Sequence, residues 1–146
     1  MSIYPFTQVR GLEMLFPEID KEKTIQNVTE LLSSYGKLCR LSGVSQQKMV
    51  ATFSAEPFAP TGANTNEQHI FDALDYQSQL KEINCAIKLL NVNYQQLLID
   101  KYVKEYKDYW IYTKHSLSMA TYYRDMKKAK FYFAEAYKKG ALLVYV

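Results

Sequence analysis

Hydrophobic residues recur every three or four positions in several separate segments of the chain. The spacing is clear over residues 21–41, 66–90, 94–106 and 119–137, and a shorter segment beginning at Asp108 precedes the last of these. This period places hydrophobic side chains on one face of an α-helix. The pattern therefore predicts an all-α fold, in which a helical N-terminal segment is followed by a C-terminal domain of four helices.

The first of these helices has suitable residues at both of its ends. Asp20 can cap its N-terminus, and Gly43 is the residue type that most often ends a helix. A broad hydrophobic stripe of this kind must pack against another part of the protein. Its members are Ile25, Val28, Leu32, Tyr35 and Cys39.

The composition changes between residues 42 and 65, where two prolines and two glycines occur and no period is sustained. We expect a linker or long loop there, between an N-terminal arm and helix at residues 1–41 and a domain at residues 66–146. The segment FSAEPFAP could instead form an ordered strap across the surface. The hydrophobic tail ALLVYV either docks on the core or pairs as a single strand with a partner.

The last long helix is marked by a cap and by a narrow hydrophobic stripe. The Ser118 hydroxyl can accept a hydrogen bond from an amide of the first helical turn, so the helix is predicted to begin at Met119. At about 100° per residue, its hydrophobic positions fall within an arc of about 60°. These positions are Tyr122, Met126, Ala129 and Phe133.

Positive charge is concentrated in the half of the chain that contains this helix. Residues 1–72 contain six basic and eight acidic residues, whereas residues 73–146 contain twelve basic and seven acidic residues. Within residues 118–139 there are six basic and two acidic residues. Because contacts with phosphate groups are local, this clustering matters more than the modest net charge of +3.

A capped basic helix that follows a short helix and a tight turn is typical of a DNA recognition helix. Arg124 is the strongest candidate for reading a base, because a guanidinium group can pair bidentately with guanine. Ala120 and Thr121 could contact a base edge or a thymine methyl group, and Tyr123 either contacts a phosphate or belongs to the core. The predicted DNA-binding residues are Ser118, Ala120, Thr121, Tyr123, Arg124, Lys127, Lys128 and Lys130, the three lysines as phosphate contacts. The alternative is an ordinary solvated helix face.

Several other side chains are expected to have structural roles. His115 falls at a hydrophobic position of the short helix, so we expect it to be packed and hydrogen-bonded. Trp110 is expected to anchor the short helix on the core, and His69 to lie on the surface. Phe131 lies about 180° from the buried stripe, so it could pack on the N-terminal helix, on the tail or on a second subunit.

No catalytic, cofactor-binding or metal-binding motif occurs in the sequence. It contains no glycine-rich phosphate loop, no HExxH or GxSxG motif and no paired carboxylates. Cys39 and Cys85 are far apart and are expected to be free thiols. No hydrophobic run is long enough for a secretory signal or a membrane span, so we expect a cytoplasmic protein. Because catalytic and cofactor-binding motifs are missing, we also expect a protein that is not an enzyme and needs no cofactor.

The order of the last four predicted helices is similar to that of region four of bacterial sigma factors. The helix at Asn91–Tyr102, the string LSMATYYRDMKKAKFYFAEAY and the closing GALLVY resemble the ArpU family of phage transcriptional regulators. FPEIDKEKT and LLSSYGKL resemble the N-terminal part of the same family. Two positions depart from the helix-turn-helix pattern: Ser116 stands where glycine is common, and Tyr112 where a small residue is common.

This resemblance implies a sequence-specific regulator that binds double-stranded DNA and acts on phage or prophage late genes for packaging or lysis. The alternative is a helical interaction module that docks RNA polymerase or a phage component without reading DNA. A homodimer is a further possibility, with the helix at residues 21–41 and the tail as candidate surfaces. A dimer would predict half-sites about one helical turn apart.

Overall fold

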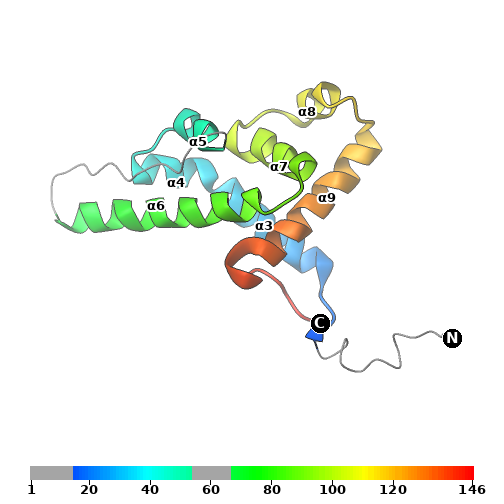
Figure 1. Ribbon diagram of the computed structural model, residues 1–146, viewed down its shortest axis with the longest axis horizontal. Coiled ribbons are helices and arrows are strands. Elements are labelled where there is room, and N and C mark those ends of the chain that lie inside the picture. The colour runs from blue at the N-terminus through cyan, green and yellow to red at the C-terminus, as the bar shows by residue number, and fades with distance from the viewer. Residues whose placement is uncertain (1–14, 54–66) are drawn as a thin grey trace.

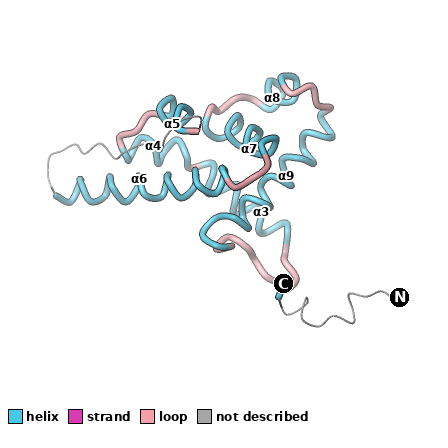
Figure 2. The backbone as a smooth tube through the Cα atoms, viewed as in Figure 1, coloured by secondary structure: helices cyan, strands magenta, loops and turns pink. Residues whose placement is uncertain are grey.

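Helices make up most of the described part of the computed structural model, which covers residues 15–53 and 67–146 (Figure 1). Within these ranges no strand is present, and the helices are joined by loops (Figure 2). The prediction of an all-α fold is therefore confirmed. The elements are α3 (Lys21–Ser33), α4 (Tyr35–Ser42), α5 (Gln46–Thr52), α6 (Glu67–Lys88), α7 (Val92–Leu98) with a π-helical turn (Ile99–Val103), α8 (Asp108–Lys114), and α9 (Met119–Ala136) with a 3-10 turn (Tyr137–Lys139).

Two sets of helix contacts build the hydrophobic core. Helix α4 packs along α6, while α3 and α7 both pack against α9 (Figure 1). Residues on both sides of the predicted boundary at 42–65 contribute to this one core. Its largest fully buried side chains include Leu32, Tyr35, Leu80, Ile83, Leu98, Tyr122 and Phe133.

The predicted first helix is present, but it is divided in two at Ser34. Its start is confirmed, since the Asp20 carboxylate accepts a hydrogen bond from the Lys23 amide. Its end is also confirmed, because Gly43 caps α4 with a φ of 79°. At Ser34 the side chain donates to the Leu31 carbonyl at 2.6 Å. A serine that bonds its own backbone in this way competes with helical hydrogen bonding, which explains the interruption.

The prediction of a loop is wrong for residues 46–52, which form α5. The Ser45 hydroxyl caps this helix by accepting a hydrogen bond from the Lys48 amide at 3.1 Å. Val44 and Met49 are buried in the core and hold the helix in place. Seven residues are too few to show a sustained hydrophobic period. Most of FSAEPFAP and the predicted helix start at Asn66 lie outside the described residues, as does the side chain of His69.

The central helices follow the predicted hydrophobic pattern. Leu80, Ile83 and Ile87 of α6 are buried, and the Asn91 side chain caps α7 by accepting from the Asn93 amide. The helix that was expected to reach Tyr106 ends at Val103, in a π-helical turn. This turn carries the buried Asp100.

The C-terminal tail is docked on the chain itself, as one of the two predictions stated. Leu142 and Leu143 pack against the core. Tyr145 forms an isolated antiparallel bridge with Ile19, and the Asp20 amide donates to the Val144 carbonyl at 2.7 Å. The hydrophobic stripe of α3 and α4 and part of the tail are used within this chain, while Tyr145 and Val146 are exposed.

Candidate functional site

Helix α9 buries the hydrophobic stripe that its sequence predicts. Tyr122, Met126, Ala129 and Phe133 are all buried, and α3 and α7 pack against the helix. The orientation of α9 is therefore fixed by packing on one side. The side chains on its opposite face are left in solvent.

The N-terminal turn of α9 joins three of the predicted site residues. The Ser118 hydroxyl accepts a hydrogen bond from the Thr121 amide at 3.1 Å, which confirms the predicted cap. The Thr121 hydroxyl accepts from the Ser118 hydroxyl at 2.9 Å and from the Arg124 guanidinium at 3.2 Å. These contacts direct the Arg124 side chain toward the start of the helix, where a recognition helix makes its base contacts.

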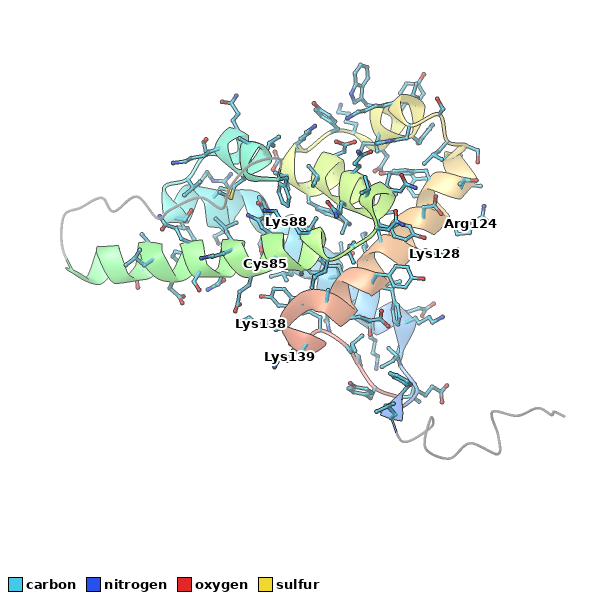
Figure 3. All side chains as sticks on the ribbon, viewed as in Figure 1. Cys85, Lys88, Arg124, Lys128, Lys138 and Lys139 are labelled. Atoms are coloured by element: carbon cyan, nitrogen blue, oxygen red, sulfur yellow. The ribbon has the colours of Figure 1, made fainter. Side chains whose placement is uncertain are left out.

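The outer face of α9 carries most of the remaining predicted site residues. Arg124 and Lys128 project from the part of α9 that lies at the edge of the molecule (Figure 3). Neither residue forms an ion pair with a described residue, nor does Lys127. The exposed members of this outer face are Ala120, Tyr123, Arg124, Lys127 and Lys128.

Lys130 does not belong to this outer face. Its ammonium group donates to the Thr29 hydroxyl of α3 at 3.0 Å and lies 5.5 Å from the centre of the Tyr102 ring. Burial lowers the pKa of this amine, and the nearby Lys101 lowers it further. The prediction that Lys130 contacts phosphate is therefore corrected, because the side chain instead links α9 to α3.

The turn between α8 and α9 has the hydrogen bonds of a Schellman motif. The Ser116 amide donates to the Thr113 carbonyl at 3.1 Å, and the Leu117 amide donates to the Tyr112 carbonyl at 2.9 Å. Ser116 has a φ of 57°, the left-handed conformation that favours glycine. Gly43 makes the equivalent turn after α4 with a φ of 79°. Ser116, which stands where glycine is common, is thus a strained residue in an otherwise regular turn.

We expect the Ser116→Gly variant to be more stable than the parent protein by about 0.5 to 1 kcal/mol. Glycine removes the steric cost of the left-handed conformation, which is partly offset by its greater freedom in the unfolded chain. Urea denaturation followed by circular dichroism measures the difference. Ser78→Gly, at an exposed position in the interior of α6, is the matched control and is expected to destabilise. A loss of stability in Ser116→Gly would contradict the assigned strain.

Asp108, the first residue of α8, holds this helix against α9 and the π-helical turn. Its carboxylate accepts hydrogen bonds from the Tyr122 hydroxyl at 2.6 Å and from the Lys101 ammonium at 2.8 Å. The exposed Tyr123 hydroxyl approaches it at 3.4 Å. Burial acts to raise the pKa of the Asp108 carboxyl, but the hydrogen bonds it accepts lower that pKa by more. The pKa therefore lies below its ordinary value. The carboxylate is thus kept charged and fixes where α8 begins.

Asp100 holds the other end of α8 and was not among the predicted site residues. Its side chain is buried, and one carboxylate oxygen lies 2.8 Å from His115 Nε2 and 3.2 Å from the Lys114 ammonium. Lys104 lies 3.6 Å from the other oxygen. The prediction of a hydrogen-bonded His115 is therefore confirmed. An acidic residue inside the hydrophobic run LLIDKYV was the signal that could have revealed this cluster.

Two aromatic residues on α8 are exposed, which corrects the prediction that Trp110 anchors this helix. Trp110 is 59% exposed and its neighbour Tyr109 is 68% exposed. The buried anchor is Ile111, because a helix of seven residues presents only a narrow face to the core. Tyr112 is half-buried and packs its ring against Tyr122 at 5.6 Å, so a large residue is accommodated where a small one is common.

Phe131 lies against α3, one of the three locations considered from the sequence. The Lys21 ammonium lies 5.7 Å from the centre of the Phe131 ring.

Among the described residues, no group of three His, Cys, Asp or Glu side chains could hold a metal ion. The same part of the chain has no helix with the length and hydrophobicity needed to cross a membrane. Cys39 and Cys85 are free thiols.

Comparison with known proteins gives one informative similarity. The chain is 26% identical over 134 residues to ArpU of Enterococcus hirae, which is named as a proposed autolysin regulatory protein. The aligned region covers 90% of this chain and 98% of that relative. No family model matches the chain, and no solved structure matches it significantly.

Proposed function

We propose that this protein is a sequence-specific, DNA-binding transcriptional regulator in which α8 and α9 form a helix-turn-helix. The observation that carries the proposal is the two-sided character of α9. Its stripe through Tyr122 and Phe133 is buried, while Arg124, Lys127 and Lys128 are exposed. Arg124 and Lys128 project at the edge of the molecule (Figure 3). An exposed basic helix of this diameter fits the major groove of B-DNA.

The proposed contacts divide into base reading and phosphate binding. Arg124 and Thr121 lie in the first two turns of α9, where a recognition helix meets base edges. Lys127 and Lys128 lie one turn further along and suit the backbone, as does the exposed Tyr123 hydroxyl. Ser118 acts as the cap, and Ala120 is small enough to let the helix approach a thymine methyl group.

The regulatory part of the proposal has independent support. A relative that aligns with most of this chain is named as an autolysin regulatory protein. The resemblance of residues 77–145 to the ArpU family extends the proposal to phage or prophage genes for packaging or lysis. Such a regulator acts in the cytoplasm on double-stranded DNA.

Arg124→Ala is expected to weaken binding to the preferred duplex by about 5- to 150-fold and to reduce discrimination between sequences. The reason is the loss of a bidentate base contact. A selection from random duplexes identifies the preferred sequence, and fluorescence anisotropy over a salt series then measures affinity. In the same assay, Lys128→Ala should weaken all duplexes about equally and reduce the salt dependence.

The matched control is Lys37→Ala, which removes one exposed positive charge from α4, a helix that packs mainly on α6 and not on α9. This control should leave affinity unchanged within about twofold, since charges beyond a Debye length of about 10 Å contribute little. Failure of the parent protein to bind any duplex at low salt would exclude the proposal. Equal effects of Arg124→Ala and Lys37→Ala would exclude α9 as the reading element.

A second candidate function is docking on another protein, such as RNA polymerase. The observation that favours it is the pair of exposed aromatic residues on α8, Tyr109 and Trp110. Aromatic residues at this exposure are typical of protein interfaces. Binding of RNA polymerase that persists in high salt and after nuclease treatment, and that is lost in Trp110→Ala, would support this function.

A further inference from the structure

A groove of about 560 Å³ separates the beginning of α3 from the second half of α9. Ile25 of α3 and Phe131 of α9 are half-buried in its lining. Three exposed cations also line it, Lys21 from α3 and Lys127 and Lys128 from α9. The groove therefore combines hydrophobic side chains with a concentration of positive charge contributed by two helices.

Among the described residues, the positive charge of this groove is only partly offset. Glu22 is the one carboxylate in the lining, against three lysines. None of these four side chains forms an ion pair with a described residue. The Lys21 ammonium rests over the Phe131 ring at 5.7 Å, in the groove that Lys127 and Lys128 also line. The described lining of the groove therefore carries a net positive charge.

We propose that this groove binds the phosphodiester backbone that flanks the base pairs read by Arg124. Lys21 then belongs to the DNA interface, although it lies almost 100 residues before α9 in the sequence. The inference rests on the proposed function, because it extends the contacts of α9 to α3. Phe131, which lies among cations on the outer side of α9, acquires a role as the support of Lys21.

The geometry of α9 agrees with this extension. At about 1.5 Å per residue, Lys128 lies about 6 Å and Phe131 about 10 Å beyond Arg124 along the helix axis. A recognition helix meets base edges with its N-terminal residues, so residues about 6 to 10 Å further along α9 would lie beyond the base contacts, where they can approach the phosphate backbone. The groove between α3 and α9 is continuous with the outer face of α9, because Lys127 and Lys128 belong to both.

Lys21→Ala tests this inference by fluorescence anisotropy with a preferred and a random duplex. We expect both duplexes to be bound about three- to tenfold more weakly at 0.1 M salt. The slope of log affinity against log salt should fall by about 0.9, the value for one lost phosphate contact. Lys21→Arg should restore the slope. Glu22→Gln should strengthen binding of both duplexes, because it removes the negative charge from the groove.

Lys23→Ala is the matched control, since this exposed lysine is on the same helix but does not line the groove. It should leave affinity and slope unchanged. If Lys21→Ala behaves like Lys23→Ala while Arg124→Ala still weakens binding, the inference about the groove is wrong and the proposed function stands. If no variant or parent protein binds DNA, both are wrong. An acidic protein that binds the parent but not Lys21→Ala, with duplex affinity unchanged, would also overturn the inference.

Discussion

Replacing Arg124, Lys127 and Lys128 together with glutamate is expected to weaken duplex binding by more than about 100-fold. The variant loses one base contact and two phosphate contacts, and it places negative charge against the DNA backbone. Its fold should be unaffected, because all three side chains are exposed and form no ion pair with a described residue. Fluorescence anisotropy at low salt measures the loss.

A matched triple variant separates this surface from the total charge of the protein. Lys37, Lys48 and Lys81 are exposed on α4, α5 and α6, and their replacement by glutamate makes the same change in net charge. We expect this control to bind DNA much more tightly than the α9 variant. Similar losses in the two triple variants would show that binding depends on overall charge and not on α9.

Asp100→Ala is expected to lower the free energy of unfolding by about 1.5 to 3 kcal/mol, the range for losing hydrogen bonds to a charged group. The buried carboxylate accepts from His115 and Lys114 of the α8 region, so its loss leaves these groups without their partner. Lys104, at 3.6 Å, would also lose its ion pair. The end of α8 and the turn before α9 should then become less ordered.

Urea denaturation measures this change, and hydrogen exchange at residues 111–117 locates it. Asp75→Ala removes an exposed carboxylate from α6 and is the matched control, with an expected change below about 0.5 kcal/mol. If Asp100→Ala is no less stable than Asp75→Ala, the cluster does not hold α8 in place. A normal stability combined with lost DNA binding would instead indicate that Asp100 affects the interface directly.

The parts of the fold that depend on local signals were predictable from the sequence. The Ser118 cap and the buried stripe of α9 follow from residues within a few turns of one another. The same is true of the Asp20 and Gly43 caps. In each case the hydrogen-bonding groups are neighbours in the sequence, so the sequence contains the whole interaction.

The errors arose where tertiary contacts decided the outcome. Helix α5 is held by burial of Val44 and Met49 beneath other helices. Lys130 resembles Lys127 and Lys128 in composition, yet it lies only about 70° from the centre of the buried stripe, whereas the other two lie about 130° away. The angular position of Lys130 could therefore have indicated that its side chain turns toward the core. Its hydrogen-bond partner, the Thr29 hydroxyl, lies on α3.

The candidate interface was predictable on α9 and not elsewhere. Arg124, Lys127 and Lys128 could be chosen because helical period and charge agree. Lys21 could not be chosen, because only the packing of α3 against α9 brings it beside Phe131. Asp100 was missed because its partners lie on α8 and in the following turn.

Backbone amide NMR of the full chain, titrated with a mixed-sequence duplex at low salt, tests most directly whether the outer face of α9 contacts DNA. We expect the largest shift changes at residues 118–128 and at Lys21, with small changes in α4 and α6. Shifts confined to α4, α5 and α6, with α9 unchanged at saturating duplex, would contradict the proposed interface.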